Sequence, residues 1–525
     1  MYIAMDMGTS NTRLWLCEND DVYHFVKAEI GAGITKSKGK DFLFREVKNL
    51  ITNLLEQANV TVNNIDCIIA AGMAGSELGL IDVPRISLPA DAYALADNLN
   101  KHTLPEISPV PFIFVSGLKK CNGDYIQDII RGEETETVGI VDSIPLKQDS
   151  VIILPGTHNK IISVSKDNEI TDFHTTMSGE VLHNVISNSI LSGSVGHEFT
   201  PNEYFVLLGA KTAKENGINA ALFQIRVMSL NGISSNELSS YLYGCILGQD
   251  IELIKRIAQN KHVYVGGNET LKSIYCILIG KSAQPIAQEL SLDANRKGLS
   301  KIFKLYHNIN ARNDLLKSIQ NEKLIAIIRK PDTDSLIPAV NALYNGGLRL
   351  VEITFDRSGN TPPTETAKLI NLIKANTSML VGAGTVTSKE ELLLAYKAGA
   401  SYIISPNCDI EIIREARKLG LVSIPAAYTP TEITNALNAG ADYIKIFPAD
   451  DLPKGYIKAI KAPLCDAKLL AVGGVTKYNA KEFIENGFDG IGVGSNLYDK
   501  NLIAAKNFKA LENLAREYVD AVKKA

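Results

Sequence analysis

The C-terminal part of the chain alternates between short apolar runs and longer stretches whose apolar residues recur every three or four positions. The short runs are typical of buried strands, and the longer period is typical of helices. Several helical stretches end at a glycine that leads into the next apolar run, as in Ala439-Gly440-Ala441. That arrangement is the helix-to-strand connection of a parallel sheet. Eight such strands in about 210 residues predict an α/β fold of the small (β/α)₈ TIM-barrel type. The predicted strands are Leu324–Ile328, Leu350–Phe355, Leu380–Val386, Tyr402–Ser405, Val422–Ala426, Tyr443–Phe447, Leu469–Val472 and Gly490–Val493.

The N-terminal part contains two strand–turn–strand elements whose turns are rich in small polar residues. The first spans residues 2–16 around a turn at 8–11, and the second spans 151–165 around a turn at 155–160. Such turns expose backbone N–H groups and hydroxyls. Helical patterns follow from about 180 to 260. Two similar elements are expected of a duplicated, two-lobed ATPase fold.

The pattern changes between the two parts. Polar breaks at 295–298 and 307–310 surround short helical pieces, after which the strand–helix alternation begins. We therefore predict one domain over 1–307, a linker over 308–314 and a second domain over 315–525. A chain of 525 residues is too long for a single core, which agrees with this division.

Composition narrows the classes of function. The formal net charge is −4, so the chain has no basic field for nucleic acid. No apolar stretch approaches a membrane-spanning length, and the first residues enter a strand without a charged leader or a cleavage site. The seven cysteines lack the spacing of metal ligands and suggest reduced thiols. We expect a cytoplasmic protein with small-molecule substrates and neither a nucleic-acid nor a membrane partner.

Two charged residues interrupt strands of the predicted barrel. Lys445 is flanked by isoleucines, so its amine either reaches solvent from an edge strand or is desolvated. Desolvation lowers the pKa of an amine and makes it a nucleophile toward a carbonyl, through a Schiff base. Glu352, within Leu350–Thr354, must be paired or protonated if it is buried. The alternatives are a structural ion pair between the two residues, or an aldolase in which Lys445 forms the imine and Glu352 moves protons.

Chemistry in such barrels lies at the carboxyl ends of the strands. Glycine-rich turns after the seventh and eighth strands present N–H groups suited to a phosphate. The predicted substrate therefore carries a phosphate at one end and a keto acid at the other. The alternatives to a functional role are a solvated loop arginine for Arg329 and a turn residue after Gly384 for Thr385. The residues at these strand ends are Arg329, Thr385, Pro406, Gly473, Gly474, Gly494 and Ser495.

Residues 318–523 resemble the 2-keto-3-deoxy-6-phosphogluconate/galactonate aldolase family. The resemblance implies Lys445 as the Schiff-base lysine, Glu352 as the acid/base, no cofactor, and a trimer formed through these domains. It also implies Arg329, Thr385 and Pro406 around the keto acid, and Gly473, Gly474, Gly494 and Ser495 around the phosphate. Val472 before the glycine pair, and Asn407, are closer to the galactonate branch than to the gluconate branch. The motifs are Leu324–Arg329, Val351–Ile353, Val381–Val386, Ile404–Asn407, Lys445–Pro448, Ala471–Val475 and Gly494–Tyr498.

The first strand–turn–strand element predicts a site for Mg²⁺ and ATP. Asp6 would hold the metal, and the turn residues would contact the phosphates. Val265-Gly266-Gly267 is a late strand and glycine pair suited to adenosine. Arg131 beside two glutamates is suited to a sugar acid, with a solvated helix start as the alternative. The predicted residues are Asp6, Gly8, Thr9, Asn11, Gly156, Thr157, Gly266 and Gly267 for Mg²⁺ and ATP, and Arg131, Glu133 and Glu134 for the sugar acid.

Residues 1–307 resemble the 2-keto-3-deoxy-galactonate kinases of the actin/hexokinase-like superfamily. The resemblance implies in-line transfer of the ATP γ-phosphoryl group to the terminal hydroxyl of the sugar acid, in a cleft that closes between two lobes. Asp128, Glu133 and Asp172 remain alternatives for the catalytic base. The matching segments are Asp6–Asn11, Ala71–Ser76, Arg131–Thr135, Pro155–His158 and Met177–Glu180.

The two predicted reactions are consecutive. The first part would phosphorylate 2-dehydro-3-deoxy-D-galactonate at its 6-hydroxyl, and the barrel would cleave the product to pyruvate and D-glyceraldehyde 3-phosphate. Two alternatives stay open: the same reactions on the gluconate epimer, and a first part that only senses a sugar acid.

Overall fold

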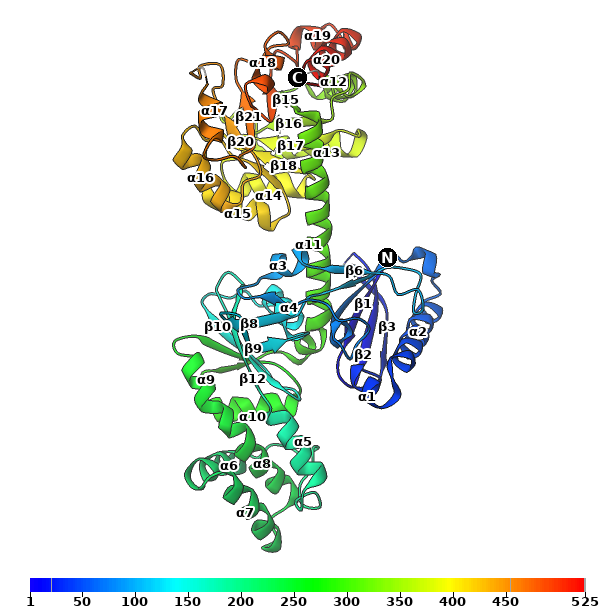
Figure 1. The fold of residues 1–525 in the computed structure, drawn as a ribbon, viewed down its shortest axis with the longest axis vertical. Coiled ribbons are helices and arrows are strands. Elements are labelled where there is room, and N and C mark those ends of the chain that lie inside the picture. The colour runs from blue at the N-terminus through cyan, green and yellow to red at the C-terminus, as the bar shows by residue number, and fades with distance from the viewer. Residues whose placement is uncertain (20, 454, 524–525) are drawn as a thin grey trace. The chain divides into compact units, whose positions relative to one another are not determined.

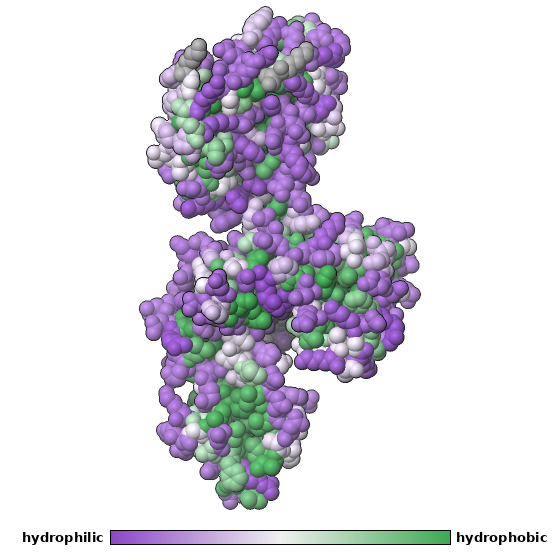
Figure 2. All heavy atoms as spheres, viewed as in Figure 1, coloured by the Kyte–Doolittle hydropathy of each residue, from purple (hydrophilic) through white to green (hydrophobic). Residues whose placement is uncertain are grey.

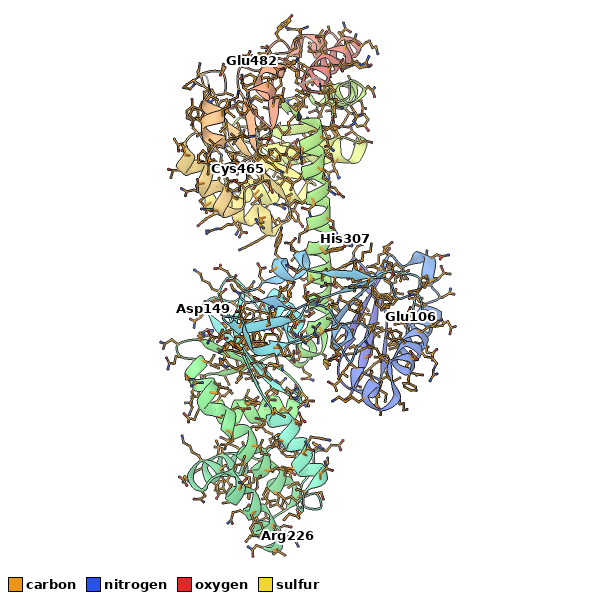
Figure 3. All side chains as sticks on the ribbon, in the orientation of Figure 1. Glu106, Asp149, Arg226, His307, Cys465 and Glu482 are labelled. Carbon is orange, nitrogen blue, oxygen red and sulfur yellow. The ribbon has the colours of Figure 1, made fainter. Side chains whose placement is uncertain are left out.

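The computed structural model describes residues 1–19, 21–453 and 455–523 and divides into two units, Met1–Tyr306 and His307–Ala525 (Figure 1). His307 lies on the long helix α11 (Gln288–Glu322), which contains the division (Figure 3). Within the described residues, no helix is long and apolar enough to cross a bilayer.

The first sheet of the first unit has the order β3-β2-β1-β4-β7-β6. β1 pairs antiparallel with β2 and parallel with β4, so Asp6 lies opposite Arg13 on one side and Ala71 on the other. β1 and β4 are fully buried, which explains their continuous apolar sequences. The strands are β1 (Tyr2–Met7), β2 (Thr12–Glu18), β3 (Asp21–Ala28), β4 (Cys67–Gly72), β6 (Asn100–His102) and β7 (Phe112–Phe114).

The second sheet repeats this arrangement with the order β12-β11-β10-β13-β14. β10 pairs antiparallel with β11 and parallel with β13, as β1 does with β2 and β4. The repeat confirms the duplicated two-lobed fold. The strands are β10 (Ser150–Leu154), β11 (Asn159–Val164), β12 (Ile170–Thr176), β13 (His262–Val265) and β14 (Ala283–Pro285), and a smaller sheet holds β5 (Ile86–Ser87), β8 (Leu118–Asn122) and β9 (Tyr125–Ile130).

Helices α5 to α9 lie between β12 and β13, where the sequence predicts helical patterns. Figure 2 shows hydrophobic residues gathered on the visible face of this helical part. Exposed apolar side chains occur on α6, such as Leu207, and on α7, such as Phe223 and Leu230. The helices of the unit are α1 (Thr35–Lys38), α2 (Lys40–Gln57), α3 (Ala92–Asp97), α4 (Glu133–Ser143), α5 (Ser178–Asn188), α6 (Glu203–Asn216), α7 (Ile218–Leu230), α8 (Ser235–Leu247), α9 (Ile251–Ile257) and α10 (Glu269–Ile279).

Residues 308–314, for which the sequence predicts a linker, are helical within α11. They contain no proline, and Ile309 and Leu315 are buried, so the helical period continues through the polar positions. Gly298 does not break the helix. It lies against α4, where a Cβ atom would come within 1.9 Å of the Thr135 carbonyl oxygen.

The second unit is a parallel barrel of eight strands in the order β19-β18-β17-β16-β15-β22-β21-β20. The barrel closes between β19 and β20, where Ala426 pairs with Lys445 and the Lys445 N–H donates to the Pro425 carbonyl at 2.8 Å. The predicted TIM barrel is therefore confirmed. The strands are β15 (Leu324–Ile328), β16 (Leu350–Thr354), β17 (Leu380–Gly384), β18 (Tyr402–Ile404), β19 (Val422–Ile424), β20 (Ile444–Ile446), β21 (Leu469–Val472) and β22 (Gly490–Val493).

Helices surround the barrel and alternate with its strands (Figure 1). The C-terminal residues of α11, including Leu315 and Ile319, belong to the apolar cluster inside the barrel, together with Ile325 and Ile327. Arg312 on α11 pairs with the buried Asp442, which also accepts the Ser423 N–H. The helices are α12 (Thr333–Asn345), α13 (Pro363–Asn376), α14 (Lys389–Lys397), α15 (Ile410–Lys418), α16 (Pro430–Ala439), α17 (Tyr456–Lys461), α18 (Ala480–Glu485), α19 (Lys500–Ala504) and α20 (Phe508–Lys523).

Candidate active sites in the two units

Lys445 lies in the middle of β20, and its side chain faces the barrel interior. Its neighbours Ile444 and Ile446 are completely buried on the outer face of the strand, in the layer under the helices. Lys445 itself is 9 % exposed, so it does not reach bulk solvent. Burial lowers the pKa of its amine, and the charges of Glu352 and Arg329 act in opposite directions, Glu352 raising and Arg329 lowering it. The amine also lies 4.8 Å from the centroid of the Phe447 ring.

Glu352 faces the same interior from β16 and is 3 % exposed. Burial raises the pKa of its carboxyl group to about 7, although the charges of Lys445 and Arg329 oppose the shift. Its Oε1 atom occupies the space beside Gly384, where a Cβ atom would come within 2.6 Å. Its Oε2 atom is buried and has no hydrogen-bond partner among the described residues. The Lys445 amine is thus a weaker base than usual and the Glu352 carboxyl group a weaker acid. Such a pair is suited to proton transfer near neutral pH.

The other predicted barrel residues lie at the carboxyl ends of five strands. Arg329 follows β15, Thr385 follows β17 with a φ of 59°, and Pro406 follows β18 after one residue. Gly494 and Ser495 follow β22, and Gly494 lies beside Arg329, whose Nη1 would be 3.8 Å from an added Cβ.

Gly473 and Gly474 follow β21 with φ values of 101° and 66°, which other residues rarely adopt. A Cβ atom on Gly474 would come within 2.4 Å of the Asp450 carboxyl group, in the loop after β20. The structure therefore brings the predicted keto-acid and phosphate residues to the same end of the barrel as Lys445.

In the first unit, Asp6 is buried at the end of β1. Its carboxylate pairs with Arg13 at 2.9 Å. Burial raises the pKa of Asp6, Arg13 lowers it, and Glu133 raises it further. Glu136, on the first turn of α4, lies close to the same group, and burial raises its pKa to about 8, with Glu133 and Asp6 adding to the shift. The carboxyl groups of Asp6, Glu133 and Glu136 thus repel one another, but no three acidic side chains among the described residues lie close enough together to hold a metal ion by themselves.

The two glycine-containing turns line one cavity of about 550 Å³. The β1–β2 turn is closed by the Gly8 N–H, which donates to the Asn11 carbonyl at 2.8 Å, and the turn after β10 begins beyond Leu154. Gly266 and Gly267 pack against the start of that second turn, since a Cβ on Gly267 would come within 3.1 Å of Pro155. The cavity is lined by Thr9, Ser10, Gly156, Thr157, Gly179, Glu180, Leu182, His183, His197, Tyr243, Asn268, Thr270 and Leu271.

A buried hydrogen-bond network holds the second turn. Asn159 accepts the Gly156 N–H at 3.1 Å and donates to Asp250 at 3.1 Å. Tyr275 and Ser178 also donate to Asp250, at 2.6 and 2.8 Å. Asp250 is therefore the common acceptor that fixes Asn159, and Asn159 in turn fixes the Gly156–Thr157 turn.

The predicted sugar-acid residues separate into two groups. Glu134 is completely buried and accepts the Gly132 N–H at 2.7 Å, so its carboxylate is engaged by its own backbone. Arg131 donates from Nη2 to the Val83 carbonyl at 2.9 Å, while its Nε and Nη1 atoms are buried and have no partner among the described residues. Arg85 lies near Arg131 and also has a buried, unpartnered Nε atom. Unpartnered guanidinium donors are suited to a carboxylate ligand.

Of the three candidate bases, Glu133 is the one whose charge acts on Asp6. Its carboxylate is 3.7 Å from the buried amine of Lys160, and it also accepts the Arg131 N–H at 2.9 Å. Asp128 instead accepts the N–H groups of Ile129 and Thr175.

Asp172 pairs with Lys120 at 2.6 Å. Sequence reasoning missed Lys160, although a lysine directly before Ile161 and Ile162 carries the same signal as Lys445.

The folds and sites define a phosphotransferase unit of the duplicated ATPase type and an aldolase-type barrel in one chain. The family model for 2-keto-3-deoxy-galactonokinase matches residues 6–302, and the model for KDPG and KHG aldolase matches residues 315–514. The chain belongs to both families and is an enzyme with a kinase domain and an aldolase domain.

Characterised relatives match each half separately. The barrel half is 35 % identical over 200 residues to the 2-dehydro-3-deoxy-6-phosphogalactonate aldolase of Escherichia coli, covering 38 % of this chain and 96 % of that protein. It is 28 % identical over 213 residues to the 2-dehydro-3-deoxy-phosphogluconate aldolase of Haemophilus influenzae, covering 40 % of this chain and 97 % of that protein. The N-terminal half is 26 % identical over 262 residues to the 2-dehydro-3-deoxygalactonokinase of Escherichia coli, covering 50 % of this chain and 82 % of that protein.

Proposed function

We propose that the chain catalyses two consecutive steps of galactonate catabolism. The kinase domain phosphorylates 2-dehydro-3-deoxy-D-galactonate at the 6-hydroxyl with ATP. The aldolase domain then cleaves the 6-phosphate to pyruvate and D-glyceraldehyde 3-phosphate through a Schiff base on Lys445. The single observation that carries the proposal is the buried Lys445 and Glu352 pair inside the barrel, with the predicted phosphate-binding glycines at the same end.

In the aldolase domain, the neutral amine of Lys445 attacks the C2 carbonyl carbon of the substrate. A proton moves from the attacking nitrogen to the oxygen, which gives the carbinolamine. Glu352 in its protonated form then donates to the carbinolamine hydroxyl, which leaves as water and gives the protonated imine. The resulting Glu352 carboxylate removes the proton of the C4 hydroxyl. The C3–C4 bond breaks, its electron pair enters the imine to form an enamine, and the aldehyde leaves. Proton return to C3 and addition of water release pyruvate and the free amine.

A pKa near 7 for Glu352 supports both of its roles, because the group is present in each protonation state at neutral pH. The lowered pKa of Lys445 supports its role as nucleophile, because a larger share of the amine is unprotonated. Arg329, Thr385 and Pro406 are proposed at the keto-acid end of the substrate. The phosphate is proposed against the backbone of Gly473, Gly474, Gly494 and Ser495.

In the kinase domain, we propose that ATP binds in the cavity between the two turns, which Thr9 lines on one side and Gly156 and Thr157 line on the other. Gly8 and Asn11 do not line this cavity but close the turn that carries Thr9. Asp6 is suited to Mg²⁺, since magnesium is usually held by one or two carboxylates together with substrate phosphates and waters. The cation would neutralise charge on the phosphates during transfer. Gly266 and Gly267 are proposed on the adenosine side.

The sugar acid is proposed to place its carboxylate on the unpartnered donors of Arg131, with Arg85 beside it. Glu133 is our choice for the base that accepts the proton of the 6-hydroxyl, because it lies near Asp6 and Lys160. Glu134, which the sequence also suggests for the sugar acid, is proposed instead to hold the turn before α4, because its carboxylate is engaged by Gly132.

Borohydride reduction in the presence of pyruvate tests the aldolase proposal. Wild-type enzyme is expected to gain a reduced pyruvyl adduct on Lys445, detected by peptide mass spectrometry, and Lys445→Ala is expected to gain none. An adduct that persists in the variant at another lysine would refute the assignment. Asp356→Asn serves as a matched control on the rim, since Asp356 is engaged by Ser358 and Lys330.

Three further measurements test the substrate, the kinase activity and the assembly. Comparing kcat/KM for the two phosphorylated epimers decides between galactonate and gluconate, and we expect the galactonate compound to be preferred. ATP consumption with the unphosphorylated keto acid excludes a sensor that only binds it. We also propose a cytoplasmic trimer formed through the barrels, and light scattering coupled to gel filtration would give three chain masses.

A further inference from the structure

Tyr402 occupies an unusual place below the catalytic carboxyl group proposed above. Tyr402 and Ile404 belong to the apolar cluster inside the barrel, and Ile403 between them belongs to the outer layer. The Tyr402 side chain therefore points into the barrel, as Glu352 does from β16. It is completely buried.

Glu352, Gly382 and Tyr402 lie on three neighbouring strands, with Gly382 on the middle one. Glu352 pairs with Gly382 across β16 and β17, and β17 in turn pairs with β18, which carries Tyr402. Neighbouring strands are about 4.8 Å apart. Gly382 has no side chain, and the Tyr402 ring fills the space above it, where an added Cβ would come within 2.3 Å of Cε2. The ring thus crosses the middle strand in the direction of Glu352.

Both side chains carry a buried polar atom without a hydrogen-bond partner among the described residues, Oε2 of Glu352 and the hydroxyl of Tyr402. Oε1 of Glu352 lies instead at Gly384, two residues nearer the mouth of the barrel than Gly382. One carboxyl oxygen therefore faces the mouth, and the Tyr402 ring lies at the level below. Buried polar groups in proteins are almost always hydrogen-bonded, to protein or to an internal water.

We propose that Tyr402 is a positioning residue for Glu352: the Tyr402 hydroxyl donates to one buried water molecule, which in turn donates to Oε2 of Glu352. The bond fixes the carboxyl group, keeps Oε1 toward the substrate, and stabilises the ionised form. The inference rests on the proposed role of Glu352 as the acid/base of the aldolase.

The charges around Glu352 fit this arrangement. The charged groups that act on Glu352 are Lys445 from β20 and Arg329 from the end of β15, and the charge of Glu352 in turn acts on Tyr402 from β18. Burial and the charge of Glu352 hold the pKa of the Tyr402 phenol well above its usual value, so the hydroxyl keeps its proton. It is therefore available as a donor over the whole range in which Glu352 titrates.

The test is the pH profile of aldolase turnover in Tyr402→Phe, which removes only the hydroxyl. Loss of a donor to the carboxylate raises the pKa of Glu352, so the inflection of the profile near pH 7 is expected to move to higher pH by about one unit. At pH 7 we expect kcat to fall about fivefold, in step with the ionised fraction of Glu352, while KM stays nearly constant. Exchange of the pyruvate methyl protons in D₂O should slow by a similar factor.

Tyr443→Phe is the matched control. Like Tyr402, Tyr443 lies inside the barrel and has a buried hydroxyl without a partner among the described residues. The charges that act on Tyr443, however, are those of Asp489 and Asp442 and not that of Glu352. Its profile is expected to match the wild type. A Tyr402→Phe profile that coincides with that of Tyr443→Phe would overturn the inference. If the wild type itself gave no borohydride adduct with pyruvate, the proposed aldolase mechanism would fail instead, so the two failures are distinguishable.

Discussion

At the residue scale, burial of Glu352 ties activity to a cost in stability. The folded chain holds the proton of this group up to about pH 7, whereas the unfolded chain releases it near the ordinary value of 4.5. Between these values the folded state binds more protons than the unfolded state. The contribution of Glu352 to stability therefore falls as the pH rises through this window, and the loss is complete above about pH 7.

Glu352→Gln should reveal that cost, because the amide does not titrate. We expect the variant to be stabilised relative to the wild type at pH 8, by up to about 3 kcal/mol, and by much less at pH 5. Calorimetric unfolding at the two pH values measures the difference. A stability gap between the two proteins that is the same at pH 5 and pH 8 would contradict the prediction, and loss of aldolase turnover in the same variant at both pH values is expected.

Sequence reasoning singled out Lys445 and Glu352 because a charge inside an apolar strand is costly and therefore conspicuous. It did not single out Tyr402, because tyrosine is common in strands and its hydroxyl becomes notable only beside Gly382 of the neighbouring strand. The sequence did not predict the role of Asp250 for a related reason, because Asp250 lies 91 residues from its partner Asn159. Pairings of that kind depend on the packing of the chain and leave no local pattern.

At the element scale, the two turns proposed to bind the ATP phosphates are held in place in different ways. The turn after β1 is closed by its own backbone, through Gly8 and Asn11. The turn after β10 depends on the side chains of Asn159 and Asp250, which reach it from β11 and from the segment before α9. Its geometry is therefore sensitive to a change far along the chain.

Asp250→Asn should weaken ATP binding without touching the nucleotide. The change introduces an amide where Ser178 and Tyr275 both donate, so Asn159 loses its fixed partner and the Gly156 turn loosens. We expect KM for ATP to rise about tenfold, with cleavage of the phosphorylated substrate unchanged. Asn202→Asp, on the cap of α6, is a control of similar chemistry outside this network. An unchanged KM for ATP would show that the turn does not need Asp250.

The elements themselves were largely predictable. The strands at 324–328, 469–472 and 490–493 coincide with the apolar runs, and the other barrel strands end within one or two residues of the prediction. The differences arise where a run continues into the loop, as at Thr385, which leaves the ladder with a positive φ. The polar positions before the barrel suggested short helical pieces and a linker. The structure instead has one helix, α11, which continues through them with its buried positions intact.

At the scale of the whole molecule, the two proposed reactions use residues from different units. Asp6 belongs to the first unit and Lys445 to the second. In the proposed function, the phosphorylated keto acid is the product of one site and the substrate of the other, so the chain as a whole should convert the unphosphorylated acid and ATP to pyruvate.

Mixing two inactive chains tests whether the intermediate travels through solution. Asp6→Asn and Lys445→Ala should each fail to release pyruvate from the unphosphorylated acid with ATP, because each lacks one chemical step. The mixture should regain the reaction, with a lag before pyruvate appears, since the intermediate must leave one chain and reach another. Raising the amount of the Asp6→Asn chain, whose barrel is intact, should shorten the lag in a coupled lactate dehydrogenase assay. If the mixture stays inactive while each variant keeps its remaining half-reaction, the intermediate does not cross between chains, and the two sites must act on it within one molecule.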